Sequence, residues 1–342
     1  MEWNCLPTCI GSLPHLRPKQ AVDVELRHLK KIPYWPQLPA IGFEENMYAQ
    51  YATHLPGVNI DAHAKRISVD LEDYDPERFY EAVLGENFHN FEYPRTCFHG
   101  LFELLEEWEV PKEALYLKGQ VTGPISMGLQ VFDQTGKSVI YDESYSEIVR
   151  MNLNMMMRQQ EFMLREKHPR TILFLDEPSL SLVGTPFAAV SKENVVRWIN
   201  EVLEGVTSVK ALHCCGNTDW PMVLSTNIDV LSFDAYSYGY TISLFPDDIA
   251  SFLERGGAIA WGIVPNDEEG LKKETPASLV ERLEREMFKL SSRGISPDLV
   301  LRASIITPQC GLGPLNDESL AEDALHLLVG TSEAMRARHS LE

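Results

Sequence analysis

Several features are missing from this 342-residue chain, and each absence excludes a class of protein. No apolar run approaches the roughly 20 residues needed to cross a bilayer, so we expect no membrane contact. No glycine-rich dinucleotide fingerprint follows the first apolar run, which argues against an open doubly wound sheet. Positive charge is scarce: 30 Lys and Arg stand against 50 Asp and Glu, for a formal charge of −20. Such a surface repels phosphate backbones, so nucleic acid is not an expected partner.

Cysteine is also sparse. The six cysteines are too few and too irregularly spaced for a disulfide framework in a chain of this size. Residues 1–9, MEWNCLPTC, lack the basic and apolar regions of a signal peptide. We therefore expect a cytoplasmic protein with reduced thiols.

What the chain does contain is a repeated unit: a short β-rich run, a polar or Gly/Pro turn, and an amphipathic helix. Eight such runs predict an α/β protein with one (β/α)8 TIM-barrel domain over residues 1–342. The segment 40–112, between the second and third strands, is predicted to be an insertion over one end of the barrel. The predicted strands are 5–10, 32–38, 114–121, 171–176, 209–214, 229–234, 258–263 and 299–306, and helices are predicted at 98–109, 142–167, 191–205, 275–292 and 317–335, with a hairpin at 57–71.

The barrel prediction indicates where a site would be found, because catalytic groups collect at the carboxyl ends of barrel strands. The seventh strand ends in 261-WGIVP-265 and offers no ionisable group before Asp267. The polar residues at the other strand ends are Ser12, Gln37, Thr122, Asp176, His213 with Cys215, Asp234 and Cys310.

The stretch 211-ALHCCGNTDW-220 predicts part of a metal site. Side chains alternate along a strand, so His213 and Cys215 share one face and Cys214 lies on the other. A nitrogen and a sulfur are the ligand mixture that zinc prefers. Cys310 and Asp234 end two other strands and are expected at the same mouth. One such residue alone is usually structural. We expect Cys5, Cys9, Cys97 and Cys214 to be packing residues, and His28, His99 and His326, in helical stretches, to be surface or packing residues.

The same residues carry a family likeness. His213-x-Cys215, followed by Cys310-Gly-Leu, resembles the zinc motif in the C-terminal catalytic barrel of cobalamin-independent methionine synthase. Three further stretches are similar to that family: 10-IGSLPH-15, 122-TGPIS-126 and 175-LDEPSL-180. The matches run in order from residue 10 to residue 313.

The resemblance implies a zinc-dependent methyltransferase that makes methionine from homocysteine. A free thiol is mostly protonated at pH 7, whereas a metal-bound thiol is deprotonated and nucleophilic. Asp176 would hold the amino group of homocysteine and Ser12 its amino-acid end. A carboxylate of 43-FEENM-47, Glu44 or Glu45, would assist with the ammonium group. Asp234 stands where the family has a glutamate ligand to zinc.

Three departures from the family concern the methyl donor. Full-length members have two barrels and this chain has room for one. Ile263 stands where the family has a proton-donating histidine, and 124-PISMGLQVFDQTG-136 lacks the family's tryptophan near the folate. Methyltetrahydrofolate releases an amine that needs an acid, whereas cob(I)alamin leaves without a proton. The departures therefore favour methylcobalamin, or a methylated corrinoid protein as a partner.

Three alternatives stay open. A corrinoid-dependent methyltransferase with another thiol acceptor, such as coenzyme M, would need cationic groups for a sulfonate, and the strands offer only Arg302, predicted mid-strand. A metal-free enzyme like uroporphyrinogen decarboxylase would use arginines and would not need the His-x-Cys motif. A corrinoid-binding or zinc-storage protein is the non-enzymatic alternative, and no Asp-x-His-x-x-Gly corrinoid motif is present.

Overall fold

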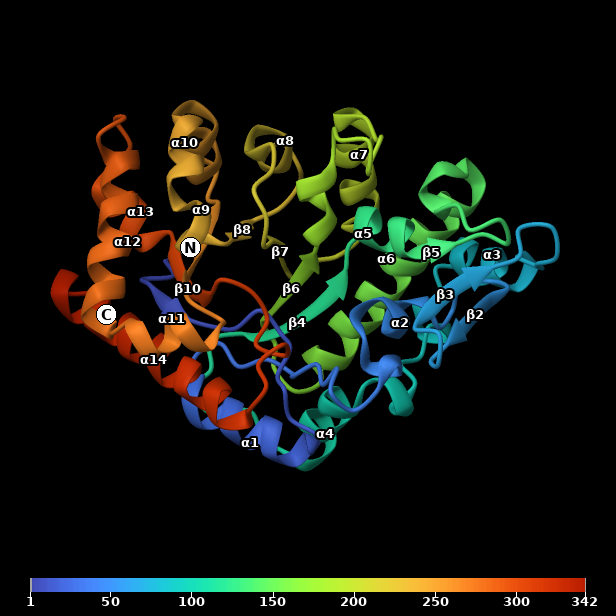
Figure 1. Cartoon of the computed structure of the whole chain (residues 1–342), viewed down its shortest axis with the longest axis horizontal. Helices are drawn as coiled ribbons and strands as arrows, with labels where there is room; N and C mark the ends of the chain where they lie inside the picture. The colour runs from blue at the N-terminus through green and yellow to red at the C-terminus, as the bar shows by residue number, and fades with distance from the viewer. Residues whose placement is uncertain (1, 342) are drawn as a thin grey trace.

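A curled sheet of seven parallel strands forms the centre of the molecule (Figure 1). The computed structural model describes residues 2–341. Along the sheet the strand order is β1-β10-β9-β8-β7-β6-β4, and every neighbouring pair is parallel. These strands are β1 (Leu6–Pro7), β4 (Leu117–Thr122), β6 (Thr171–Asp176), β7 (Val209–Cys214), β8 (Val230–Phe233), β9 (Ala258–Val264) and β10 (Ser304–Pro308).

Helices lie around the outside of this sheet (Figure 1). Several begin at a capping side chain; at the start of α12 (Pro276–Ser291), for example, the Thr275 hydroxyl accepts a hydrogen bond from Ser278 N, and proline follows at the first helical position. No helix among the described residues is long and apolar enough to cross a membrane. The helices that follow the strands are α1 (Pro18–His28), α4 (His99–Glu107), α5 (Pro124–Gln130), α6 (Glu143–Arg165), α7 (Lys192–Val202), α8 (Trp220–Leu224), α9 (Ala235–Tyr238), α10 (Pro246–Glu254), α11 (Glu268–Lys273), α12 (Pro276–Ser291), α13 (Pro297–Arg302) and α14 (Glu318–His339).

Strand alternation divides the core into two layers. One buried cluster contains alternate residues of successive strands and fills the concave side of the sheet. The residues between them belong to the larger cluster that also contains the apolar faces of the helices. The concave-side cluster is made of Trp3, Leu6, Ile32, Ile172, Phe174, Ala211, Val230, Ala258, Ala260 and Ile305. Because side chains alternate, positions 176, 213, 215 and 232 continue this concave face toward the carboxyl ends of the strands.

The second predicted strand, 32–38, is not a strand in the structure. Pro33 and Pro36 have no N–H to donate, so a continuous ladder cannot form there. Two isolated parallel bridges replace it, Tyr34 with Lys118 and Gln37 with Ser12. The segment therefore contacts β4 on one side and the residues after β1 on the other.

The last strand was predicted at 299–306, but in the structure it starts later than predicted. Residues 297–302 form α13, because Ser296 caps that helix and Pro297 occupies its first position. Strand β10 starts only at Ser304. Arg302 is thus in the last turn of a helix, where it pairs with Asp298 and Glu2.

Residues 40–112 contain the predicted hairpin and the predicted helix α4. The hairpin pairs β2 (Val58–Asp61) with β3 (Arg66–Val69) in antiparallel register. A third short strand, β5 (Val131–Phe132), pairs with β3, so this small sheet also uses residues after β4. It lies at the right-hand edge of Figure 1, near α2 (Met47–Ala52) and α3 (Glu77–Leu84).

Candidate metal centre

Three of the four predicted metal ligands come together at the carboxyl ends of the strands. The ligand atoms of His213, Cys215 and Cys310 all lie within 4.8 Å of one another. Strands β7 and β10 are separated by two strands in the sheet, so its curvature brings these residues into contact. We call these three residues the strand-end group.

His213 has the surroundings of a metal ligand. Its side chain is buried, and its Nδ1 lies 3.0 Å from the Ser232 hydroxyl oxygen, within hydrogen-bond distance. Its Nε2 is also buried but has no hydrogen-bond partner. A buried polar atom without a partner is costly, and a ligating histidine is held by a partner on its other nitrogen. Because Nδ1 is taken by Ser232, Nε2 is the ring nitrogen left to bind an ion together with the two cysteines.

The two thiols of the strand-end group lie within hydrogen-bonding reach of each other. A hydrogen bond with the Cys310 thiol, followed by His213, lowers the pKa of Cys215 below its usual value. The same hydrogen bond, together with burial, raises the pKa of Cys310. Thiolate sulfur together with imidazole nitrogen is a ligand set that zinc prefers.

Cys214 and Asp234 are not members of the strand-end group. Cys214 is buried in the helix-side cluster, as strand alternation predicts, and its thiol donates to the Gly216 carbonyl at 3.4 Å. Asp234 caps α9, where its Oδ1 accepts from Ser237 N at 2.8 Å. Burial raises the pKa of Asp234. The structure thus gives Asp234 a local role as a helix cap.

Asp176 lies beside the strand-end group. It is the register partner of His213 across β6 and β7, and it is buried. Its Oδ1 has no hydrogen-bond partner. Burial raises the pKa of Asp176 to about 6, although His213 and Lys118 act in the opposite direction. An unpartnered buried carboxylate oxygen is a ready acceptor for a cationic ligand.

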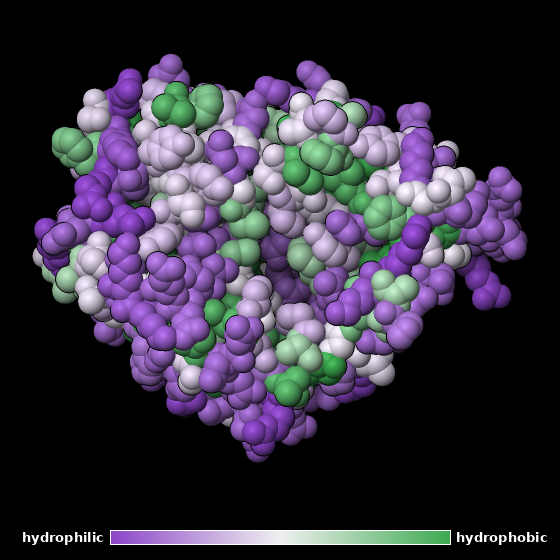
Figure 2. Space-filling view, in the orientation of Figure 1, coloured by the Kyte–Doolittle hydropathy of each residue, from purple (hydrophilic) through white to green (hydrophobic). Residues whose placement is uncertain are grey.

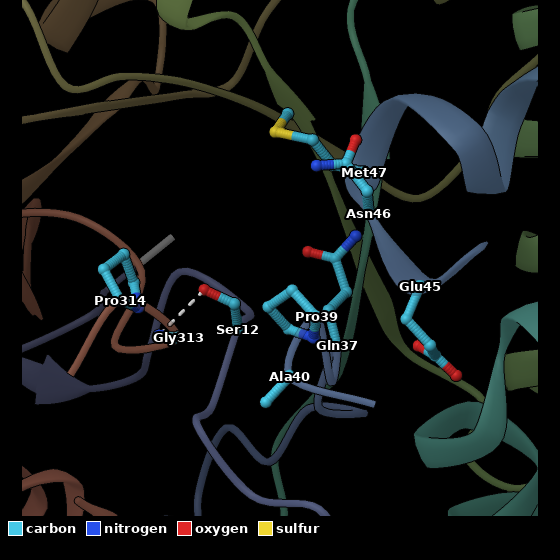
Figure 3. Close-up of a pocket in the computed structure, with 9 residues that line it drawn as sticks. All are labelled: Ser12, Gln37, Pro39, Ala40, Glu45, Asn46, Met47, Gly313 and Pro314. Carbon is cyan, nitrogen blue, oxygen red and sulfur yellow. Dashed lines mark hydrogen bonds between the residues drawn. The ribbon is translucent and has the colours of Figure 1, made fainter. Parts of the chain in front are cut away.

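The carboxylates of Glu44 and Glu45 differ in their surroundings. Glu44 is exposed. Glu45 is buried, and its Oε1 accepts from both the backbone N (2.7 Å) and Nδ1 (2.6 Å) of His99. Its Oε2 accepts from Gln50 Nε2 at 3.0 Å. In Figure 3 the Glu45 side chain points away from Ser12. The buried carboxylate is therefore already well supplied with donors.

Ser12 packs against the loop that carries Cys310. The hydroxyl oxygen of Ser12 accepts from Gly313 N at 3.1 Å (Figure 3), and its carbonyl accepts from Leu312 N at 2.9 Å. A side chain at Gly311 would come within 2.2 Å of the Ser12 hydroxyl. The glycines of 310-CGLG-313 therefore allow the Cys310 loop to lie directly on Ser12.

A second contact joins the stretches 122-TGPIS-126 and 175-LDEPSL-180. Glu177 is buried, and its carboxylate accepts from Ile125 N (2.8 Å), Ser126 N (2.9 Å) and the Ser126 hydroxyl (2.6 Å). A Cβ at Gly123 would come within 2.2 Å of Glu177. Burial raises the pKa of Glu177 to about 7, against these hydrogen bonds. The Asp-Glu-Pro and Thr-Gly-Pro stretches thus hold each other in place and fix Asp176.

Sequence reasoning missed three residues near the strand-end group. Ser232 positions His213. The one sequence signal for this is that Ser232 lies two residues before Asp234, so both side chains are expected on the same face of the strand. Lys118 is fully buried under Asp176, with its Nζ 4.5 Å from the Phe174 ring centroid and bonded to Ile10 O. Tyr48 is near the site. Burial raises its pKa to about 12, and the nearby acidic groups of Glu177, Cys215 and Asp176 add to this shift. No spacing in the sequence indicates Lys118 or Tyr48.

A cavity of about 390 Å3 opens beside Ser12 (Figure 3). Figure 2 shows a hollow near the middle of this face of the molecule, with polar residues at its base. The volume is suitable for a small organic ligand. The cavity is lined by Ser12, Gln37, Pro39, Ala40, Glu45, Asn46, Met47, Gly313 and Pro314.

Three solved structures resemble the chain over most of its length. A B12-independent methionine synthase from a Shewanella species, in complex with selenomethionine, has a TM-score of 0.64 at 14% identity, with 99% of each chain covered. A methyltransferase from Methanosarcina mazei has a TM-score of 0.56 at 13% identity, covering 96% of this chain and 94% of that one. A protein assigned as a vitamin-B12 independent methionine synthase from Listeria monocytogenes has a TM-score of 0.56 at 15% identity, covering 93% and 85%.

At these identities the likeness establishes the fold. No protein-family model matches the chain, and no curated protein matches it.

Proposed function

We propose that this protein is a zinc-dependent methyltransferase that makes methionine by transferring a methyl group to the thiolate of homocysteine. The observation that carries the proposal is the strand-end group, in which the unpaired His213 Nε2 faces two thiols next to the unpartnered Oδ1 of Asp176. The names of the neighbours, two methionine synthases and a methyltransferase, support the same class of reaction.

On the acceptor side, His213, Cys215 and Cys310 would hold zinc, with Asp234 as a candidate fourth ligand. A zinc ion there would keep the homocysteine sulfur deprotonated at neutral pH. Asp176 would bind the substrate ammonium through its free oxygen, and the Ser12 hydroxyl would donate to the amino-acid end. Glu45 already accepts three hydrogen bonds, so we assign it a smaller part than Asp176, and exposed Glu44 a smaller part still.

For the donor we propose methylcobalamin or a methylated corrinoid protein. Ile263 is fully buried and carries no proton to give to a leaving amine. It lies where the register between β9 and β10 shifts, so Gly262 and Val264 pair with consecutive residues of β10. A corrinoid leaving group needs no acid at this place.

Methyltetrahydrofolate is the second candidate donor. The names of the Shewanella and Listeria proteins, which describe them as independent of B12, favour it. The two donors differ in their demand for a proton donor, and the experiment below separates them.

The acceptor is better described as an amino acid than as a sulfonate. A sulfonate such as that of coenzyme M, or the carboxylates of a porphyrinogen, would need cationic side chains at the strand ends. Arg302 lies in α13, before β10 begins, and is paired with acidic residues. Lys118 is buried, and burial lowers its pKa to about 8.

We also infer that the sheet closes into a (β/α)8 barrel through residues 32–38, with residues 40–112 as an insertion between the second and third barrel positions. The bridges from Tyr34 to Lys118 and from Gln37 to Ser12 support closure, because they join the β4 edge to the segment after β1.

The test mixes zinc-loaded protein with methylcobalamin and, in turn, homocysteine, coenzyme M and a simple thiol, and follows demethylation by absorbance. With homocysteine as the acceptor, we expect turnover from methylcobalamin to be at least 100-fold faster than turnover from methyltetrahydrofolate, since general acid catalysis is worth roughly 10²–10⁴-fold. Robust turnover from methyltetrahydrofolate alone would assign the protein to folate. Absence of turnover with every thiol and both donors would favour zinc storage.

A further inference from the structure

A second group of potential metal ligands lies on the helices outside the sheet. The ligand atoms of His28, Glu322 and His326 are all within 4.8 Å of one another. His28 is the last residue of α1, and the other two lie one turn apart near the start of α14. Residues four apart share one face of a helix, so α14 presents both side chains to α1. We call these residues the helix group.

His28 provides the observation that points to a ligand. Its side chain is only 10% exposed, and its Nε2 is buried without a hydrogen-bond partner. The nearest carboxylate oxygen, Glu322 Oε1, is 3.6 Å away, which is too long for a hydrogen bond. The rings of His28 and His326 meet edge to face, with centroids 4.3 Å apart. A buried nitrogen therefore faces a carboxylate and a second imidazole and bonds to neither.

Glu322 is the carboxylate that the helix group offers beside the two imidazoles. A neutral imidazole has a free lone pair for a metal. Arg27 would compete with a metal ion for the Glu322 carboxylate, because its Nη1 is 3.1 Å from Glu322 Oε1. The Arg27 side chain is 55% exposed and also pairs with Asp23, so this contact is weak and easily displaced.

We propose that the helix group binds one divalent transition-metal ion, with zinc as the expected occupant, and that this ion joins α1 to α14. Two imidazoles and a carboxylate are a known type of zinc ligand set, and solvent would complete it, since His326 is exposed. Zinc with bonds of about 2.0–2.1 Å has ligand atoms about 3.3 Å apart. The side chains must therefore move inward by a small amount when the ion binds.

The role of such an ion would be structural. His28 and Glu322 are almost 300 residues apart in the chain, so the ion would connect the first helix to the last. A metal that binds only the folded state stabilises it in proportion to the logarithm of its concentration over Kd. The helix group contains no thiol, so it does not duplicate the strand-end group.

The experiment measures zinc bound to the full chain after chelator treatment and dialysis against micromolar Zn2+. We expect two equivalents for the unmodified protein and for Asp323→Asn, an exposed charge-matched control on α14. His326→Gln and Glu322→Gln should each weaken the second equivalent by at least 10-fold. Zinc should also raise Tm less in these two variants than in the control.

Cobalt distinguishes this site from the strand-end group. Co2+ bound by thiolates gives a charge-transfer absorption, whereas Co2+ at the helix group should bind without adding to that band. Cys215→Ser should remove the band and leave the equivalent that depends on His326. If His326→Gln, Glu322→Gln and Asp323→Asn bind the same amount of zinc with the same affinity, the helix group is not a metal site, whatever the strand-end group binds.

Discussion

The strand-end group and the helix group each bring three potential metal ligands within 4.8 Å of one another, but they are built differently. The first is formed by residues that end strands, and its members include two thiols and a buried histidine held by Ser232. The second lies between two helices, uses nitrogen and oxygen, and includes an exposed histidine. Under the two proposals above, the thiols beside the Asp176 carboxylate would serve chemistry, while the imidazoles and carboxylate between the helices would serve stability.

The largest effect should come from removing a ligand of the strand-end group. Cys215→Ser is expected to lose most of the zinc at that site and to lower methyl transfer more than about 100-fold, beyond the range for outer-shell partners. Cys214→Ser is the matched control, because its thiol lies in the helix-side cluster. Metal analysis and turnover are measured on both. Equal zinc content in the two variants would contradict the assignment of ligands.

The next largest effect should come from Ser232→Ala, which tests whether Ser232 holds His213 in place. Ser232→Ala should lower zinc affinity about 10–100-fold, because His213 Nδ1 loses its hydrogen bond with the Ser232 hydroxyl. Competition with a chelator of known affinity gives the value. Ser243→Ala is the control, since that exposed hydroxyl bonds only a local carbonyl. An unchanged affinity in Ser232→Ala would mean that the imidazole is held by packing alone.

Asp176 tests the substrate side of the comparison. Asp176→Asn should raise KM for homocysteine at least 10-fold, because a charge-assisted hydrogen bond is worth about 1.5–3 kcal/mol. Zinc content should stay normal. Glu45→Gln should change KM less, since His99 and Gln50 already occupy that carboxylate. A larger KM effect in Glu45→Gln than in Asp176→Asn would reverse the two assignments.

The last effect is on stability and not on activity, and it concerns Lys118, which is buried within the sheet near Asp176. Burial lowers its pKa from 10.5 to about 8, so below pH 8 it is charged in both states and the burial cost is fully present. Between pH 8 and 10.5 Lys118 binds more protons in the unfolded state, so the contribution of Lys118 to stability rises with pH. The total is at most roughly 3 kcal/mol.

Denaturant unfolding at pH 7.5 and pH 10 checks this value. Lys118→Met should lack the rise, whereas Lys19→Met, at an exposed position, should keep it. Identical pH dependence in all three proteins would show that Lys118 is neutral at both pH values or freely solvated.

Much of the fold could be predicted from the sequence, and the errors have local physical causes. The strands 171–176 and 209–214 were predicted to the residue, because each is a short, mainly apolar run bounded by turns. The segment 32–38 failed because its two prolines remove ladder donors. The segment 299–306 failed because a Ser-Pro helix start precedes apolar residues that suit either structure.

By itself, the sequence determined which residues share a strand face. Alternation was enough to pair His213 with Cys215 and to exclude Cys214. Only the tertiary structure decided which strand ends meet, because the curvature of the sheet sets the distance between β7 and β10. It also decided that Asp234 caps a helix, that Glu45 faces His99, and that His28 meets residues almost 300 positions away. Such contacts depend on how helices and loops pack, and no local pattern in the chain encodes them.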